Sequence, residues 1–321
     1  MKKVLVLTAA MMIAVPVCAQ AAAWSVPSNV RVVQKSNTDT AGRVYRTIQA
    51  AINSISGETA TNPFIVKVMP GIYNETISMK SFVTVEGSGV ENTIITATAS
   101  ATEGFGCTTG TLKMANDSVA KNLTVKRTFT GTGYNGNSVN AIAVSNVKAV
   151  VDGVKAEATS INAQNADGIC IAGDAANLEV LNSTIIATNT GGNQANAVYA
   201  DGGASIFTAK NSKFIGYNNG TTGDIINYET TGAVVKISDS EIVSAGTSGA
   251  TYILNGNGSL MTVTNSKIIG SCHLNPDYDN GKLMILANNS FDLGITSVCQ
   301  NWNHPNIKFI GNYNASGAIT P

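Results

Sequence analysis

Charged and aromatic residues are scarce in this 321-residue chain, at 12% and 6% of the total, and there are only two histidines. Lysine and arginine balance aspartate and glutamate at 20 each. No nucleic-acid partner is therefore expected, because a phosphate backbone requires a clustered basic face. No CxxC pair occurs, so no structural zinc site is expected. We also expect no other metal site and no cofactor. Thirty-one glycines with few aromatic rings instead favour tight turns and small internal side chains.

Long apolar runs are also lacking, except at the N-terminus, where residues 4–17 follow Lys2 and Lys3. This run is too short to span a bilayer, and small residues suited to cleavage follow it. We expect residues 1–23 to be a signal peptide. The remaining chain would carry 18 basic and 20 acidic residues. The sequence thus predicts an exported protein without a membrane span, located outside the cell, on its surface or in a periplasm.

A short phrase recurs along the chain: a small polar residue, in most copies a second small one, then an apolar or β-branched stretch. Its copies begin at Asn92, Asn122, Asp152, Asn182, Asn211, Asp239, Asn265 and Asn289. Successive starts lie 30, 30, 30, 29, 28, 26 and 24 residues apart. A period in this range predicts a repeat architecture in which coils stack along one axis.

A second column accompanies the first. Short strand-like segments begin at Asn140, Asp167, Asn196 and Asp224, with separations of 27, 29 and 28 residues. Each coil therefore contains at least two strands in register with those of the next coil, which predicts an all-β, single-stranded parallel β-helix. A barrel or sandwich would show strand signals every 8 to 12 residues or so, without the longer period. Asparagine suits the coil corners because it tolerates left-handed backbone and can hydrogen-bond between coils.

The ends of the chain have a different pattern. Residues 24–44 are polar and are expected to be an irregular lead-in segment, after which Thr47 can cap a short helix. The apolar stripe of this helix comprises Ile48, Ala51, Ile52 and Ile55. Such a helix would shield the unpaired edge of the first coil. We expect the β-helix with its cap to span residues 45–294, and residues 295–321 to form a C-terminal cap with an edge strand at 306–311.

Four cysteines follow the predicted signal peptide, an even number in a chain expected to be exported. Cys272 and Cys299 stand 27 residues apart, about one coil, so stacking can bring them together. A Cys272–Cys299 disulfide is therefore predicted. For Cys170, the simple expectation is a buried thiol.

Three stretches near the start carry a family resemblance. Residues 45–52 (YRTIQAAI), 66–75 (VKVMPGIYNE) and 86–95 (EGSGVENTII) resemble the opening of pectinesterases, with its helix, PG-x-Y-x-E turn and EG-x-G strand. That family has a right-handed parallel β-helix, so the resemblance implies this handedness. It covers residues 45–96 well and the later chain weakly. These motifs build the first coils and do no chemistry, and they support the fold better than the activity.

The resemblance also suggests where a catalytic site would lie. The family's QAVAL, QDT and DFIFG motifs fall on consecutive coils, and in a coil-by-coil alignment their places hold Asn140, Asp167 and Asn196. The family's reaction needs a carboxylate nucleophile, a carboxylic acid and an arginine. Asp167 can supply the acid, but the neutral amide of Asn196 cannot attack an ester, and all four arginines precede these coils. Alternatively, Asp167 is one rung of a structural ladder.

Three tyrosines, Tyr199, Tyr228 and Tyr252, fall at similar places in consecutive coils. If they point outward, they form a stripe on which sugar rings can stack. If they point inward, they fill the core. A one-residue slip along a strand decides between the two.

Together these patterns predict an exported pectinesterase-like β-helix that binds or modifies an extracellular polysaccharide, with hydrolysis of a carboxylic ester on a pectin-like substrate as the reaction to test. The alternative is a catalytically inactive adhesive or structural solenoid.

Overall fold

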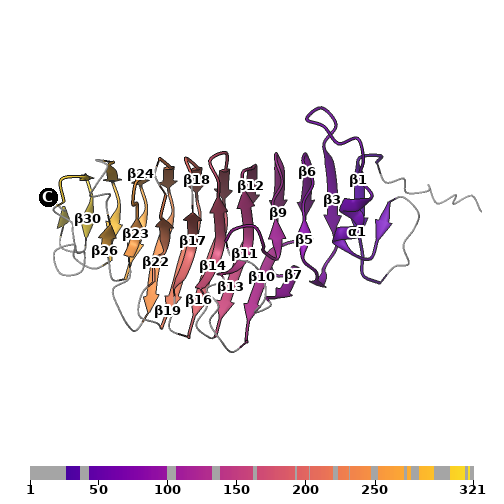
Figure 1. The fold of residues 1–321 in the computed structure, drawn as a ribbon, viewed down its shortest axis with the longest axis horizontal. Coiled ribbons are helices and arrows are strands. Elements are labelled where there is room, and N and C mark those ends of the chain that lie inside the picture. The colour runs from indigo at the N-terminus through magenta and orange to yellow at the C-terminus, as the bar shows by residue number, and fades with distance from the viewer. Residues whose placement is uncertain are drawn as a thin grey trace, which may run out of the picture.

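The computed structural model describes residues 27–36, 43–99, 106–131, 138–161, 165–191, 194–201, 203–219, 223–230, 232–246, 252–270, 273–275, 282–292, 304–314 and 317–318. They form a right-handed parallel β-helix, which confirms the predicted fold class (Figure 1). The predicted signal peptide lies outside these residues. Among the helices of the described ranges, none has the length and apolar character needed to cross a membrane.

Three parallel sheets run along the solenoid, and from residue 64 to residue 291 the chain passes through sheets 1, 2 and 3 in turn. Sheet 1 contains, in spatial order, β2 (Val44–Tyr45), β1 (Val30–Val33), β3 (Phe64–Val68), β6 (Val83–Glu86), β9 (Ser118–Lys121), β12 (Lys148–Asp152), β15 (Asn177–Leu181), β18 (Ile206–Lys210), β21 (Val234–Ser238), β24 (Leu260–Thr264), β27 (Met284–Ala287) and β29 (Ile307–Ile310). Sheet 2 contains β4 (Gly71–Asn74), β7 (Thr93–Thr98), β10 (Thr124–Phe129), β13 (Lys155–Ser160), β16 (Thr184–Asn189), β19 (Lys213–Asn218), β22 (Glu241–Gly246), β25 (Lys267–Ile269), β28 (Ser290–Phe291), β30 (Tyr313–Asn314) and β31 (Gly317–Ala318). Sheet 3 contains β5 (Ile77–Ser78), β8 (Leu112–Lys113), β11 (Ser138–Ser145), β14 (Asn165–Ala172), β17 (Ala195–Asp201), β20 (Ile226–Tyr228), β23 (Tyr252–Asn255) and β26 (His273–Asn275).

The predicted capping helix is α1 (Ile48–Asn53), at the N-terminal end of the solenoid in Figure 1. The Thr47 side chain accepts a hydrogen bond from the Ala50 N–H at 3.2 Å, as expected of an N-cap. The carboxylate of Glu75 accepts the N–H groups of Ile48 and Gln49, both at 3.0 Å. A carboxylate here complements the positive end of the helix, so the glutamate of the PG-x-Y-x-E turn has a structural role in this chain.

One expectation about the N-terminal region was wrong. Val30–Val33, within the supposedly irregular lead-in segment, form strand β1, which pairs in parallel with β3 and β2. Its valines favour extended backbone, and the polar residues around them obscured this short strand. The first coil of sheet 1 is thereby covered by two further strands as well as by α1.

From residue 122 onward, the chain turns between sheets 1 and 2 at one left-handed residue per coil. These residues, with φ between 49° and 56°, are Asn122, Asn182, Asn211, Asp239, Asn265 and Asn288. Gly153, with φ of 61°, takes the same place in its coil. The recurring phrase therefore marks the left-handed corner correctly in five of its eight copies. It was wrong by one residue at Asp152 and Asn289, and Asn92 does not have left-handed backbone. Only asparagine, aspartate and glycine adopt this backbone readily.

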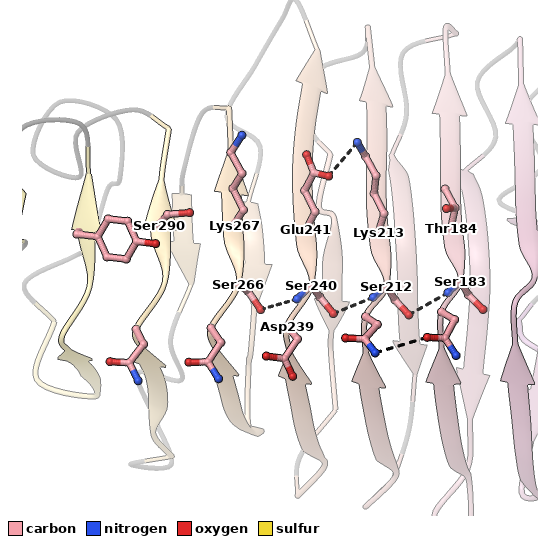
Figure 2. Close-up of a pocket in the computed structure, with 15 residues that line it drawn as sticks. Ser183, Thr184, Ser212, Lys213, Asp239, Ser240, Glu241, Ser266, Lys267 and Ser290 are labelled. Atoms are coloured by element: carbon pink, nitrogen blue, oxygen red, sulfur yellow. Dashed lines mark hydrogen bonds and ion pairs between the residues drawn. The ribbon is translucent and has the colours of Figure 1, made fainter.

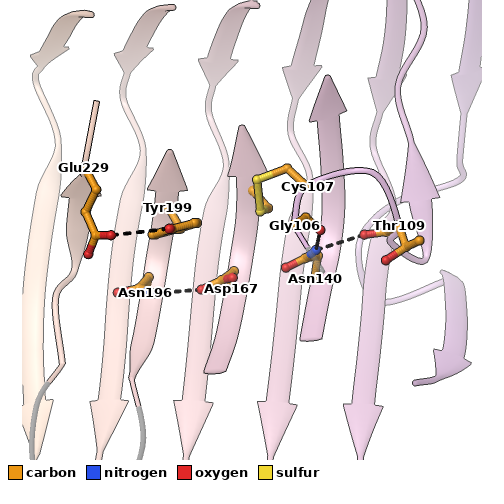
Figure 3. The surroundings of a disulfide bond; sticks show 9 residues. Gly106, Cys107, Thr109, Asn140, Asp167, Asn196, Tyr199 and Glu229 are labelled. Atoms are coloured by element: carbon orange, nitrogen blue, oxygen red, sulfur yellow. Dashed lines mark hydrogen bonds between the residues drawn. A yellow bond between two sulfur atoms is a disulfide. The ribbon is translucent and has the colours of Figure 1, made fainter. Parts of the chain in front are cut away.

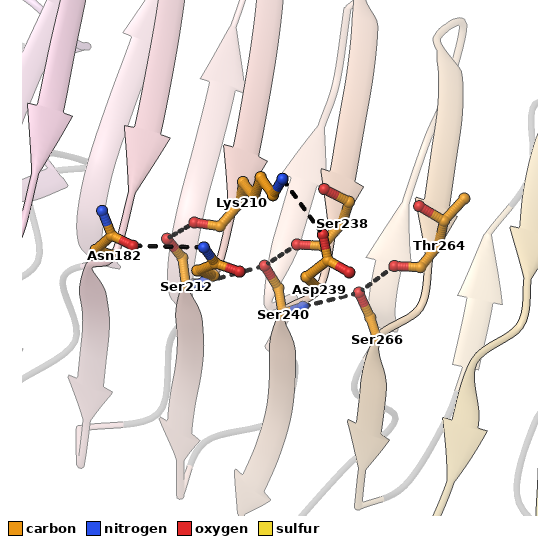
Figure 4. A network of polar contacts seen from close by, with 9 residues as sticks. Asn182, Lys210, Ser212, Ser238, Asp239, Ser240, Thr264 and Ser266 are labelled. Carbon is orange, nitrogen blue, oxygen red and sulfur yellow. Dashed lines mark hydrogen bonds and ion pairs between the residues drawn. The ribbon is translucent and has the colours of Figure 1, made fainter.

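A buried ladder of serines follows these corners (Figure 4). Ser183, Ser212 and Ser240 each donate the backbone N–H to the Oγ of the next serine along the axis, at 3.1 to 3.2 Å, and Ser266 follows Ser240. Each Oγ in turn donates to the carbonyl two residues earlier, at 2.6 to 2.9 Å. Each buried hydroxyl thus has both a donor and an acceptor, which explains the serine in the second place of the phrase.

The C-terminal end continues the same pattern for one more coil. Strand β29 pairs with β27 and is the last strand of sheet 1 among the described residues, in line with the edge strand expected at 306–311. Inside the solenoid, valine, isoleucine, leucine and alanine from all three sheets form one continuous core.

Candidate functional site

Asn140, Asp167 and Asn196 lie side by side on strands β11, β14 and β17 of sheet 3, as the coil alignment predicts (Figure 3). Ala166 packs in the core. On the other side of Asp167, a Cβ on Gly168 would meet the core residue Ile185. Asp167 lies between these two inward-facing positions and therefore points away from the core. The three predicted catalytic residues therefore form one column across three coils.

Asp167 is the chemically unusual member of this column. It is fully buried, and its Oδ1 accepts a hydrogen bond from the Asn196 Nδ2 at 2.7 Å. Burial raises the pKa of the carboxyl from 3.8 to about 7, although the hydrogen bonds from Asn196 and Ser138 lower it and the negative charge of Glu229 raises it. The side chain is therefore about half protonated near neutral pH and can donate a proton.

One orphaned oxygen supports a protonated Asp167. In the described part of the chain, neither the Oδ2 of Asp167 nor the Oδ1 of Asn196 has a hydrogen-bond partner, and both are buried. A carboxylate offers no donor, whereas a carboxylic acid has one O–H. A buried carboxylate oxygen without a donor is costly, so the unpartnered Oδ2 favours the neutral acid at Asp167.

A second buried carboxyl extends the column. Asp224 lies one coil beyond Asn196 in the same column. Val198 pairs with Ile226, and Asn196 and Asp224 each stand two residues before these partners. It is 3% exposed and accepts from the Asn255 Nδ2 at 3.1 Å. Burial raises its pKa to about 6, against the lowering effect of the Asn255 hydrogen bond. The sequence pattern included Asp224 in the ladder without assigning it a chemical role, and only its burial distinguishes it.

The three tyrosines do not form the outward stripe that one interpretation predicted. Tyr228 is completely buried, with its ring 6.2 Å from that of Phe207, so the inward alternative holds for this residue. Tyr199 pairs with Asn227, one position away from Tyr228 in register, and its hydroxyl lies 3.4 Å from a carboxylate oxygen of Glu229 (Figure 3). Tyr252 lies in the column of Asp224, to which its backbone N–H donates at 3.3 Å. The three rings thus lie in three columns. Tyr199 and Tyr228 are one position apart in register, and Tyr252 is three positions before the column of Tyr199.

A loop closes the other end of the column. The Asn140 Nδ2 donates to the carbonyls of Gly106 and Thr109, at 3.0 and 2.9 Å. Between these residues, Cys107 forms a disulfide with Cys170, three residues after Asp167 on β14 (Figure 3). The amide of Asn140 is therefore committed to holding the loop, and the disulfide fastens this loop to sheet 3.

The disulfide corrects one cysteine prediction and leaves another untested. Cys170 is bridged and not a free buried thiol. The partners are 63 residues apart in sequence, so coil spacing did not indicate the pairing. Cys272 and Cys299 lie outside the described residues.

Arg127 lies close to the loop. It is 3% exposed on β10 and lines a pocket of about 290 Å³ together with Thr108, Thr109 and Lys113. Although it precedes the column in sequence, folding brings it beside the Asn140 end of the site, through Thr109. The described residues contain no cluster of three or more histidine, cysteine or acidic side chains that could hold a metal ion.

No protein-family model matches the sequence, and no curated protein sequence does either. Solved structures do match. Pectin methylesterase PemA from Erwinia chrysanthemi is 16% identical with a TM-score of 0.53, over 90% of both chains. The carrot pectin methylesterase is 15% identical with a TM-score of 0.55, over 89% of both chains. A pectin methylesterase in complex with a hexasaccharide is 16% identical with a TM-score of 0.53, over 90% of both chains. The chain thus has the right-handed parallel β-helix fold of the pectin methylesterases, and at these identities the similarity is one of fold.

Proposed function

We propose that this protein is exported and binds an extracellular polysaccharide on the face of sheet 3 that carries Asp167, where it hydrolyses a carboxylic ester of a pectin-like chain. One observation carries the proposal: Asp167, in the place of a catalytic aspartate, is buried with a pKa of about 7. A hexasaccharide complex of a protein with the same fold supports a polysaccharide as the ligand. A buried carboxyl with a pKa near neutral is typical of a proton donor in catalysis.

The proposed reaction uses water as the nucleophile, because the place of the nucleophilic carboxylate holds Asn196. Asp224, whose pKa of about 6 leaves it mostly ionised at neutral pH, takes a proton from a water that attacks the ester carbonyl carbon. Asp167 gives its proton to the oxygen of the departing alcohol, which must enter the column to reach the buried carboxyl at its unpartnered Oδ2. Two strand spacings separate the aspartates, about 10 Å between backbones, which leaves room for the water and the ester.

Release of methanol from methylated pectin tests this proposal. We expect slow release by the mature protein and its loss in Asp167→Ala and Asp224→Asn. The matched control is Asp152→Asn, which removes an aspartate from sheet 1 that pairs with Lys121 at 3.1 Å. No methanol at high protein concentration, or equal release by all variants, would refute the enzymatic proposal.

The second candidate is a non-catalytic adhesive or structural solenoid. It is favoured by the Asn196 amide, whose hydrogen bond to Asp167 at 2.7 Å makes the column resemble an ordinary side-chain ladder. This candidate predicts pectin binding without methanol release, unchanged in Asn196→Ala and weakened in Tyr199→Ala, since Tyr199 is the partly exposed aromatic residue beside the column. Affinity electrophoresis in pectin gels separates the two candidates.

Export is tested separately. N-terminal sequencing of protein recovered outside the cytoplasm should begin after Ala21 or Ala23, and recovery of an intact N-terminus would contradict the predicted signal peptide.

A further inference from the structure

A long groove lies at the corner between sheets 1 and 2, away from the sheet 3 column (Figure 2). Its volume is about 850 Å³, and it extends from the coil of Asn182 to that of Tyr313. The groove follows the left-handed corner residues and therefore runs parallel to the solenoid axis. Each coil before the last contributes the same two or three positions to its wall, and the last contributes Tyr313. A ligand with a repeating structure would therefore meet a repeating surface.

The floor of the groove is rigid. The serines of the corner ladder lie there, and their hydroxyls already accept a backbone N–H and donate to a carbonyl, as in Ser212, whose Oγ donates to the Lys210 carbonyl at 2.9 Å. A floor with satisfied hydrogen bonds loses little conformational freedom when a ligand binds. The groups left for a ligand are those along the rim.

One side of the rim is a register column on sheet 2. Thr184, Lys213, Glu241, Lys267, Ser290 and Tyr313 are paired in succession on neighbouring strands. Lys213 forms an ion pair with Glu241 at 3.0 Å (Figure 2). On the corner side the lining is asparagine apart from Asp239. Two lysines and two acids balance, so the groove has no net charge to attract a polyanion.

The C-terminal end of the groove carries an aromatic ring. Tyr313 is held on strand β30 by its pairing with Ser290 of β28, and its side chain is 52% exposed. Such a ring offers an apolar face for stacking and a hydroxyl for hydrogen bonding, the combination that a pyranose ring requires. The same ring borders a second hollow of about 200 Å³ beside Phe291.

We propose that this corner groove is a second binding site, which takes an extended neutral polysaccharide lying parallel to the solenoid axis with one sugar ring stacked on Tyr313. Amide, hydroxyl, lysine and carboxylate groups along the rim match the hydroxyls of a neutral sugar, and the balanced charge disfavours a polyuronate. The site is independent of the ester chemistry proposed for sheet 3, so either proposal can fail without the other.

Isothermal titration of the mature protein with cellohexaose, and with hexagalacturonate for comparison, tests this site. We expect cellohexaose to bind, and Tyr313→Ala to weaken it about tenfold through loss of stacking. The matched control is Tyr217→Ala, which removes a tyrosine 44% exposed on the same sheet that does not line the groove. Thr184→Trp, which fills the other end of the groove, should also weaken binding and does not depend on the C-terminal coil folding correctly.

Asp167→Asn should leave cellohexaose binding unchanged, which separates this site from the sheet 3 column. The proposal is overturned if cellohexaose fails to bind, or if Tyr313→Ala and Tyr217→Ala lose affinity for it equally. It is also overturned if hexagalacturonate binds the groove more tightly than cellohexaose.

Discussion

The buried carboxyl of Asp167 makes stability depend on pH in a direction opposite to that of most aspartates. Its pKa rises from 3.8 unfolded to about 7 folded, so between these values the folded protein binds more protons than the unfolded chain. The free energy of unfolding must then fall as pH rises through this window. Three pKa units at 1.36 kcal/mol each correspond to a loss of about 4 kcal/mol.

Replacing Asp167 with asparagine isolates this effect. In Asp167→Asn a neutral amide of nearly the same shape keeps an oxygen for the Asn196 Nδ2, so the substitution preserves the column while removing the titration. Asp224, with its own pKa of about 6, contributes a fall of the same sign in both proteins. Urea unfolding at several pH values from 4 to 8 should show the wild type losing about 4 kcal/mol more than Asp167→Asn.

The control is Asp152, whose pKa is lowered in the folded protein, chiefly by its hydrogen bond from Asn182. The lowered pKa of Asp152 stabilises the folded protein above the unfolded pKa, and this stabilisation is lost at lower pH. The free energy of unfolding of Asp152→Asn should therefore decrease relative to that of the wild type as pH rises. If the free energies of unfolding of the wild type and of Asp167→Asn change in parallel from pH 4 to 8, the pKa of Asp167 is not raised. The proposed role of Asp167 as a proton donor would then be refuted as well.

Three further perturbations probe the fold, each measured by urea unfolding of the full chain. Ser212→Ala removes the acceptor of the Ser183 N–H and should cost about 1 to 3 kcal/mol, and a cost near zero would mean that the serine ladder does not stabilise the corners. Asn211→Ala forces an ordinary side chain into a backbone with φ of 51° and should cost about 1 to 2 kcal/mol, with Asn211→Gly clearly milder; equal effects would contradict the role of the left-handed corner. Reduction of the Cys107–Cys170 disulfide should destabilise by about 4 kcal/mol, given its separation of 63 residues, and an unchanged midpoint after confirmed reduction would argue against a constraint on the unfolded chain.

The coil period could be predicted because it depends on local requirements that recur. Each corner needs a residue that tolerates left-handed backbone, and the residue after it needs a small hydroxyl to serve the next coil, as in Asn211 and Ser212. Such requirements leave the same residues at the same spacing. The exceptions, Gly153 and Asn288, misled the alignment by one residue because the phrase was defined by letters and not by backbone geometry.

The candidate site was predictable in part. Asn140, Asp167 and Asn196 share a column because the coils between them have nearly equal lengths. The predicted stripe of tyrosines was wrong because Tyr199 and Tyr228 differ by one position in register. A shift of one position moves a side chain from the outer face of a strand to its inner face. Spacing in sequence does not resolve a difference of one residue between coils of variable length.

By itself, the sequence determined the repeat, the all-β solenoid, the capping helix and the column that holds Asp167, since each follows from local backbone and side-chain preferences repeated coil after coil. The tertiary structure decided the rest: the burial that raises the pKa of Asp167, the neighbouring carboxyl Asp224, the Cys107–Cys170 bridge, and the groove that ends at Tyr313. These features depend on contacts between residues far apart along the chain, and such contacts exist only once the coils have stacked.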